Sequence, residues 1–156
     1  MGRYFGTDGI RGKVNDKLTS QLAHDLGLAV GKMLNEINGQ GSKIVVIGRD
    51  SRNSGTMLEH ALSSGLMAQG YHVLSLGQIP TPAIAYLTRY HKARLGVVIS
   101  ASHNPYWDNG IKFFDHEGKK LRDDLEHLIE TYLEEDFTLE TSVENIGQYT
   151  IETEGK

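Results

Sequence analysis

Several residue types and patterns are missing from this 156-residue chain, and each absence excludes a class of protein. It has no cysteine, which excludes disulfides and thiolate metal sites. No apolar run approaches the roughly 20 residues that cross a bilayer. The first residues also lack the charged-then-apolar pattern of a signal peptide. These features favour a cytoplasmic protein with no membrane partner.

An excess of basic residues is missing as well. The chain has 16 Lys and Arg against 20 Asp and Glu, which gives a net charge of -4. Nucleic acid is therefore not expected as a partner, because phosphate backbones require clustered positive charge. The apolar share of 38% is ordinary for one globular domain with its own core. The 18 glycines gather in loops, which favours ligand contacts made by the backbone.

What is present is an alternation of helical and strand patterns. The predicted helices cover 19–37, 55–69, 82–90 and 122–135. The predicted strands cover 43–47, 71–76, 95–99 and 111–114, with a first strand expected within 1–16. This order predicts an α/β fold, namely a three-layer α/β/α sandwich with a mostly parallel mixed sheet and helices on both faces.

The ends of the predicted helices carry recognisable capping residues. Thr19 or Ser20 is expected to cap the first helix, and Asn38-Gly39 to end it. Ser54 is expected to cap the second helix.

Two glycines, Gly27 and Gly31, lie inside the first helix and are expected to let it pack closely against the sheet. The stretch Gly27 to Lys32 is not a phosphate-binding P-loop, because its glycine spacing is one residue short and it lies within a helix.

The C-terminal part of the sequence is acidic and rich in Thr and Glu. Tyr149 to Ile151 could form a short strand, but the composition favours a tail or linker over 136–156. The domain is therefore expected to cover 1–135.

The strand 95–99 runs into Ser-Ala-Ser-His-Asn-Pro, residues 100–105. Pro105 cannot donate a ladder hydrogen bond and favours extended geometry at Asn104, so the strand should end there. Ligands of open α/β sheets bind beyond the carboxyl ends of strands. Ser102 beside His103 can therefore be a covalent nucleophile, or part of a polar turn that only caps backbone groups.

Two further loops carry arginine and glycine. Gly6 to Gly12 can converge its amides on an anion with Arg11 as a forked donor, or can be an ordinary Asp-Gly turn. Gly48 to Gly55 can be an anion or interface loop, or a loop that an Arg49–Asp50 pair holds in place.

A reversal is also predicted near residue 110. Asn109-Gly110 is a strong turn signal before the strand 111–114, which is therefore expected to run antiparallel to its predecessor. Lys112 should point opposite to Ile111 and Phe113.

Together the strings FGTDGIRG, GRDSRNSG and SASHNPYWDNGIKFF resemble the α-D-phosphohexomutase family. The resemblance runs over nearly all of residues 1–135 and implies the first domain of that fold. The opening FGTDGIRG is most similar to the bacterial branch that acts on glucosamine phosphates, rather than to the branches that act on mannose or glucose phosphates.

The resemblance implies a mutase that interconverts glucosamine 6-phosphate and glucosamine 1-phosphate through a phosphoserine and a bisphosphate intermediate. This isomerase reaction feeds UDP-N-acetylglucosamine and cell-wall synthesis. It implies one Mg²⁺ per active site, with a sugar 1,6-bisphosphate as activator. The partners implied are the phosphosugar substrate, three further domains of the same enzyme and a possible homodimer.

Roles follow residue by residue from the same resemblance. Ser102 would carry the phosphoryl group and bind the metal through its phosphate, and Arg11 and Lys112 would stabilise the charge on that group. His103 would orient groups or handle protons. Asn104 and Asn109 would bind substrate or phosphate. The resemblance assigns Arg49, Asp50 and Arg52 to loop structure or domain contacts.

Motifs of the other three domains do not occur in the sequence. The Asp-Gly-Asp-x-Asp-Arg metal loop is absent, and Asp8, Asp50 and Asp108 are too scattered to replace it. We therefore expect a fragment with negligible mutase activity of its own.

Three other functions remain open at this stage. The chain can be a non-catalytic module that binds a phosphosugar or a protein partner, or its enzyme can act on mannose or glucose phosphates. A serine hydrolase is poorly supported, because the sequence has no Gly-x-Ser-x-Gly elbow.

Overall fold

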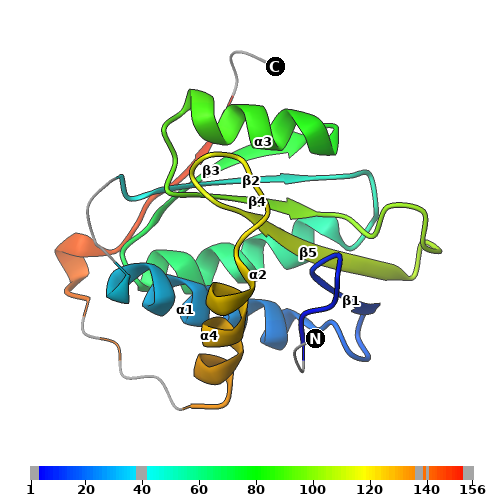
Figure 1. Cartoon of the computed structure of the whole chain (residues 1–156), viewed down its shortest axis with the longest axis horizontal. Helices are drawn as coiled ribbons and strands as arrows, with labels where there is room; N and C mark the ends of the chain where they lie inside the picture. The colour runs from blue at the N-terminus through cyan, green and yellow to red at the C-terminus, as the bar shows by residue number, and fades with distance from the viewer. Residues whose placement is uncertain (1–3, 38–41, 136–138, 140, 153–156) are drawn as a thin grey trace.

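A six-stranded mixed sheet forms the middle layer of the molecule (Figure 1). The computed structural model describes residues 4–37, 42–135, 139 and 141–152. The strands are β1 (Ile10–Lys13), β2 (Ile44–Arg49), β3 (His72–Gln78), β4 (Leu95–Ile99), β5 (Asp108–Phe114) and β6 (Tyr149–Ile151). Their order is β1-β5-β4-β2-β3-β6. Strands β4, β2, β3 and β6 are parallel, whereas β5 and β1 each run antiparallel to their neighbour.

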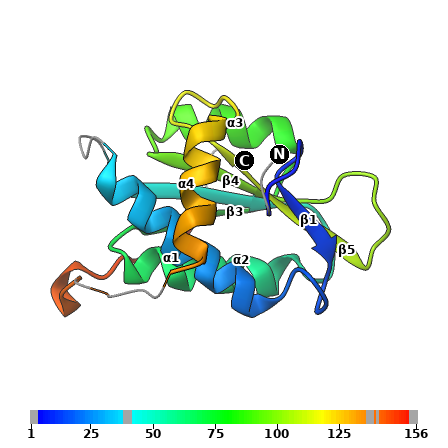
Figure 2. The same cartoon turned by 60° about the horizontal axis from the view of Figure 1, so that its bottom comes forward.

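Helices cover both faces of this sheet (Figures 1 and 2). The helices are α1 (Ser20–Glu36), α2 (Gly55–Ala68), α3 (Thr81–Tyr90) and α4 (Asp123–Leu133), with a 3₁₀ turn at Val143–Asn145. Helix α3 covers one face, and α1, α2 and α4 cover the other. The predicted three-layer α/β/α architecture is therefore confirmed. None of the described helices is long and apolar enough to cross a bilayer.

The core is divided by the sheet into two hydrophobic clusters. The larger one lies under α1, α2 and α4 and includes Leu26, Leu62 and Phe113. The smaller one lies under α3 and includes Ile84 and Phe114. Neighbouring residues of β5 thus enter opposite layers, as the alternation of a strand requires. This alternation fixes which side chains of β5 face each layer.

The helix ends agree only in part with the capping predictions. The Thr19 hydroxyl accepts a hydrogen bond from the Leu22 N–H at 3.0 Å, so Thr19 is the cap of α1. Ser54 precedes α2, but its side chain makes no capping bond and instead accepts from Asn109. The predicted stop at Asn38-Gly39 lies outside the described residues.

Glycine lets α1 and α2 approach each other closely. A Cβ built on Gly27 would lie 2.3 Å from the Leu62 carbonyl oxygen, and one built on Gly65 would lie 2.3 Å from the His24 carbonyl oxygen. A Cβ built on Gly31 would meet the Gln69 side chain at 2.4 Å. The close packing predicted for Gly27 and Gly31 is thus present, but its partner is the α2 segment and not the sheet.

The C-terminal part includes a strand. Tyr149–Ile151 forms β6, which pairs in parallel with β3 at an edge of the sheet. Its Tyr149 hydroxyl donates to the buried Glu59 carboxylate at 2.6 Å, and the Arg49 guanidinium pairs with the same carboxylate at 2.6 Å. Burial, followed by this hydrogen bond, raises the pKa of Tyr149. Side chains of β2, α2 and β6 are thereby joined at one point.

Candidate functional site

The candidate site is built on the loop that joins β4 to β5, which protrudes beyond the sheet (Figures 1 and 2). Strand β4 is buried throughout and ends at Ile99. The Ser100 N–H still donates to the Gly110 carbonyl at 2.9 Å, and Ala101 remains buried. The next two residues, Ser102 and His103, are exposed. The loop therefore presents a serine and a histidine at the carboxyl end of a central strand, where α/β sheets bind ligands.

The reversal between β4 and β5 takes place in this loop and not at Asn109-Gly110. Both residues lie inside β5, where they pair with Gly12 and Arg11 of β1. The predicted antiparallel direction of β5 is correct, but the predicted place of the turn is wrong. A Cβ on Gly110 would lie 2.8 Å from the Ser100 carbonyl oxygen and 2.8 Å from Arg11 Cγ. Glycine is required at 110 because β1, β5 and the loop meet there.

The backbone of Ser102 has a left-handed conformation, with φ at 55°. Such a conformation costs a residue other than glycine about 1–3 kcal/mol and needs support from its surroundings. The Ser102 N–H donates to the Ser100 hydroxyl at 3.0 Å, which supports one side of the residue. The exposed candidate nucleophile is thus held in a strained conformation.

Arg52, from the loop between β2 and α2, supports the other side. Its guanidinium donates to the carbonyl of Ser102 at 2.7 Å, and to those of Asn104 at 2.8 Å and Pro105 at 2.7 Å. A longer contact reaches the carbonyl of Asp108 at 3.3 Å. The sequence pattern placed Arg52 in a loop or interface role, but 50 residues separate it from Ser102, so no local signal connects the two.

Arg11 and Lys112 lie on one face of the sheet. Ile10 of β1 and Ile111 of β5 are paired, and both enter the larger core. Arg11 and Lys112, each one residue further along its strand, therefore face the α3 side as diagonal neighbours. The orientation predicted for Lys112, opposite to Ile111 and Phe113, is confirmed. Two cations from adjacent strands thus lie on the same face of the sheet.

The two candidate asparagines differ in their surroundings. Asn104 is partly buried, and its amide donates to the Asp108 carboxylate at 3.3 Å. Asn109 is fully buried. Its amide nitrogen donates to the Ser54 hydroxyl at 2.9 Å, and its oxygen accepts from the Gly110 N–H at 2.8 Å. The Asn109 side chain is therefore occupied in connecting β5 to the start of α2, and substrate contact by either asparagine stays a prediction.

His103 follows Ser102 directly but is not paired with it. Within the described residues, no hydrogen bond joins the Ser102 hydroxyl to the His103 ring. The nucleophile–base contact of a serine hydrolase is a hydrogen bond of this kind. The geometry therefore gives the hydrolase alternative no support.

The arginine pairs of the β2–α2 loop differ from the predicted one. Asp50 pairs with Arg52 at 3.1 Å rather than with Arg49, whose partner is Glu59. The Asp50 carboxylate also accepts the Arg52 N–H at 3.1 Å. An acidic residue thus holds the arginine that supports the Ser102 loop, whereas Arg49 belongs to the contact between β2, α2 and β6.

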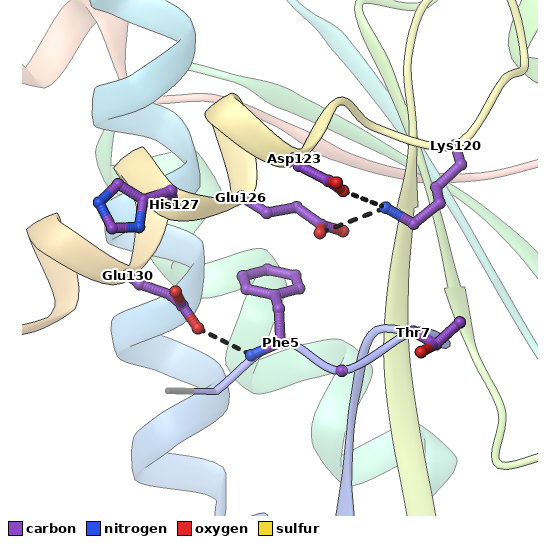
Figure 3. Close-up of a pocket in the computed structure, with 8 residues that line it drawn as sticks. Phe5, Thr7, Lys120, Asp123, Glu126, His127 and Glu130 are labelled. Atoms are coloured by element: carbon purple, nitrogen blue, oxygen red, sulfur yellow. Dashed lines mark hydrogen bonds and ion pairs between the residues drawn. The ribbon is translucent and has the colours of Figure 1, made fainter. Parts of the chain in front are cut away.

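A cavity of about 580 Å³ lies elsewhere, between α4 and residues 5–7 (Figure 3). Its lining residues are Phe5, Gly6, Thr7, Lys120, Asp123, Glu126, His127 and Glu130. The Glu130 carboxylate points to the backbone of Phe5 and accepts its N–H at 2.8 Å, and it also accepts the N–H of Tyr4 (Figure 3). No residue of the Ser102 loop lines this cavity, and its Glu130 carboxylate is committed to the backbone.

The other two carboxylates that line the cavity, those of Asp123 and Glu126, are also paired. The Lys120 ammonium lies 3.2 Å from both the Glu126 and the Asp123 carboxylates (Figure 3). Burial raises the pKa of the Glu126 carboxyl, and the hydrogen bond from Lys120 offsets part of that rise. These ion pairs hold the start of α4 against the preceding loop and so stabilise the fold.

The described residues contain no group of three or more His, Asp or Glu side chains that could hold a metal ion. Asp50 is paired with Arg52, and Asp108 accepts from Asn104. The exposed Ser102, if phosphorylated, would supply hard oxygen atoms of the kind that Mg²⁺ prefers. Phosphorylated Ser102 would therefore supply one ligand of a magnesium ion, and the described residues do not supply the rest of a magnesium site.

Comparison with known proteins assigns the family. A family model for the α/β/α domain I of phosphoglucomutase/phosphomannomutase matches residues 2–140. The chain belongs to the phosphoglucomutase/phosphomannomutase family and contains its first domain.

Individual relatives agree with this assignment. The chain is 50% identical over 150 residues to a phosphoglucosamine mutase of Finegoldia magna, covering 95% of this chain and 33% of that protein. It is 57% identical over 134 residues to a phosphoglucosamine mutase of Haemophilus influenzae, covering 85% of this chain and 29% of that protein. A solved putative phosphomannomutase from Thermus thermophilus superposes with a TM-score of 0.79 and 33% identity, covering 94% of this chain and 32% of that one. The chain thus spans about a third of the length of the curated relatives it matches.

Proposed function

We propose that this chain is the phosphoserine-bearing first domain of a phosphoglucosamine mutase. The observation that carries the proposal is Ser102, exposed and held in a left-handed conformation at the carboxyl end of β4. The 50% identity to a protein named phosphoglucosamine mutase supports the choice of substrate. The substrate class proposed is therefore a hexosamine phosphate, with mannose or glucose phosphates as the alternative within the family.

The proposed reaction moves one phosphoryl group from the enzyme and returns another. The bond between phosphorus and Ser102 Oγ breaks as a bond forms between phosphorus and a hydroxyl oxygen of glucosamine 6-phosphate. The proton of that hydroxyl leaves, and the serine oxygen recovers one. The resulting 1,6-bisphosphate reorients and gives its 6-phosphate back to Ser102, which releases glucosamine 1-phosphate.

The chain's own residues contribute charge and position to this transfer. Arg11 and Lys112 supply two cations on one face of the sheet, where they would offset charge on the phosphoryl oxygens. His103 is an exposed residue next to Ser102 and is the proposed proton carrier. Asn104 is proposed to contact phosphate, whereas we give Asn109 a supporting role because its side chain is buried and occupied.

Magnesium belongs to the same proposal. When bound, Mg²⁺ would neutralise negative charge on the phosphoryl group, with an oxygen of phosphorylated Ser102 as its ligand in this chain. The other ligands would come from a further domain. A sugar 1,6-bisphosphate would act as activator, since it can phosphorylate Ser102 directly.

The full enzyme would be considerably longer than this chain. We propose three further domains in the full enzyme, by analogy with relatives about three times as long. A homodimer and a cytoplasmic location complete the proposal, and the lack of cysteine is consistent with that location.

The test is the intact mass, with peptide mapping, of the protein purified from its native source. We expect a longer chain that carries one phosphate on Ser102. In that protein, Ser102→Ala should abolish conversion of glucosamine 6-phosphate, measured as glucosamine 1-phosphate formed. Ser51→Ala is the matched control, because Ser51 is an exposed serine of the neighbouring β2–α2 loop.

Two results would overturn the proposal or change it. A native chain that ends at Lys156 with an unmodified Ser102 would favour a non-catalytic binding module. Turnover of glucosamine 6-phosphate by the pure 156-residue chain would show that the site does not need further domains.

A further inference from the structure

Arg52 is a partly buried cation that makes contacts across the loop carrying Ser102. Only 10% of its side chain is exposed. Its Nε donates to the Asp50 carboxylate at 3.1 Å, which neutralises the charge. Its two terminal nitrogens then remain for other acceptors, and a buried guanidinium needs them because unpaired donors in a protein interior are costly.

Those acceptors are all backbone carbonyls, three in the Ser102 loop and one at the start of β5. Nη2 donates to the carbonyl of Ser102 at 2.7 Å. Nη1 donates to the carbonyls of Asn104 at 2.8 Å and Pro105 at 2.7 Å, and lies 3.3 Å from that of Asp108. The planar guanidinium of Arg52 thus binds carbonyls on both sides of the turn in this loop. A side chain this committed to backbone is better placed to hold the loop than to bind a sugar phosphate.

The contact with the Ser102 carbonyl acts on the strained residue itself. The left-handed φ of 55° at Ser102 is unfavourable for serine. Rotation of this residue toward an ordinary conformation would move its carbonyl away from Nη2. The charge-assisted hydrogen bond therefore opposes that rotation.

From these contacts we infer that Arg52 is the positioning residue of the Ser102 loop: it holds the serine in its left-handed conformation and so fixes where the hydroxyl points. The role in phosphoryl transfer rests on the proposed function, whereas the conformational role does not. Arginine is required because its fork reaches several carbonyls in one plane, which the single ammonium of lysine does not.

The first experiment measures the loop directly in this chain. Backbone amide exchange and ¹³C shifts are recorded by NMR for the wild type, Arg52→Lys and Arg122→Lys. The control replaces an exposed arginine that pairs with Asp124. In Arg52→Lys we expect exchange at the hydrogen-bonded amides of Ser102, Asn104 and Asp108 to rise about tenfold, the factor expected when one charge-assisted hydrogen bond is lost. The Ser102 carbon shifts should leave their left-handed values, while Arg122→Lys should match the wild type.

Unchanged Ser102 shifts and unchanged exchange in Arg52→Lys would overturn the inference. So would a uniform rise in exchange over the whole sheet, because that would show general destabilisation. Arg52→Gln removes the charge as well as the fork of donors, and it gives a stronger test if the variant folds. If that variant does not fold, Arg52→Lys still allows the test, because lysine preserves the positive charge beside Asp50.

The second experiment uses the longer native protein and separates this inference from the proposed function. Arg52→Lys should lower kcat about tenfold and leave KM for glucosamine 6-phosphate near its wild-type value, because the Arg52 guanidinium is engaged by Asp50 and by backbone carbonyls. A raised KM with unchanged kcat would overturn the role in transfer. If the wild-type enzyme carries no phosphate on Ser102, the proposed function fails, and the NMR result still decides whether Arg52 holds the loop.

Discussion

Two regions of this domain use one charged side chain to hold a backbone segment, but with opposite polarity. At the carboxyl end of β4, the Arg52 guanidinium donates to carbonyls of the Ser102 loop. Beside α4, the Glu130 carboxylate accepts the N–H groups of Tyr4 and Phe5 (Figure 3). The first segment is exposed and contains a strained residue, whereas the second lines a cavity.

This difference shows why a cavity alone is a poor guide to function here. The carboxylates around the cavity are engaged, Glu130 with backbone amides and Glu126 with Lys120. The Ser102 loop lines no part of this cavity, yet it presents an exposed hydroxyl, and the neighbouring strands β1 and β5 carry two cations on one face. Under the proposed function, in which this domain forms one part of a larger site, the exposed hydroxyl of Ser102 lies on an open surface.

The largest effect should come from removing the carboxylate of Glu130 on α4. Glu130→Ala leaves the N–H of the buried Phe5 without its acceptor and should lower the free energy of unfolding by about 3 kcal/mol. Glu130→Gln keeps an amide oxygen and should cost about 1 kcal/mol. Urea denaturation measures both. Equal losses in the two variants would contradict the acceptor role and would weaken the comparison with Arg52.

A smaller effect should come from relieving the strain at Ser102. Glycine adopts a positive φ without penalty, so Ser102→Gly should be more stable than Ser102→Ala by about 1 kcal/mol. The same pair of substitutions at Ser51 is the control, since Ser51 is not among the residues with positive φ. There the glycine variant should be no more stable than the alanine variant. If thermal unfolding gives the same order at both positions, the Ser102 backbone is not strained.

The smallest effect should come from removing the hydroxyl of Tyr132 on α4, which donates a hydrogen bond to another carboxylate. The Tyr132 hydroxyl donates to Glu36, and burial followed by this bond raises the pKa of Tyr132 to about 12. The raised value means that the bond stabilises the fold fully below about pH 10, and that this contribution is lost as the pH rises from there to about 12.

Tyr132→Phe should therefore be less stable than the wild type by about 0.5 kcal/mol at about pH 8. The difference should vanish near pH 12, because the wild-type tyrosine is then ionised. Urea denaturation from about pH 8 to about pH 11 follows the change. A difference that stays constant over this range would show that the bond does not depend on the protonated hydroxyl.

Much of the fold can be predicted because its signals are local. The helical spacing of apolar residues in α1 and the continuous apolar run of β4 indicate the correct element types and the layered architecture. The short strand β6 has only a weak signal: the sequence allows a strand over Tyr149–Ile151, but three residues in an acidic segment carry little pattern and a tail is favoured there. Its place beside β3 is given by backbone pairing with Val73 to Ser75 and is joined by the Tyr149–Glu59 bond, whose partners are 90 residues apart.

The site can be predicted in its residue types but not in its contacts. The position of Ser102 at the end of a buried strand follows from the apolar run and Pro105. The turn at Asn109-Gly110 is wrong because a two-residue turn signal does not register that Gly110 is packed between Arg11 and the Ser100 carbonyl. The role of Arg52 has no local signal, because every carbonyl that it binds lies about 50 residues further on.

The pairing of β1 with β5 has a consequence for biosynthesis. Ile10 pairs with Ile111, so β1 finds its partner only after about 100 further residues have been made. At about 5–20 residues per second, the wait lasts roughly 5 to 20 seconds. During that time β2 can already pair with β3 and then with β4, because all three precede β5 in the chain. The arginine of the opening motif therefore joins the site late in translation, when β5 has emerged to receive it.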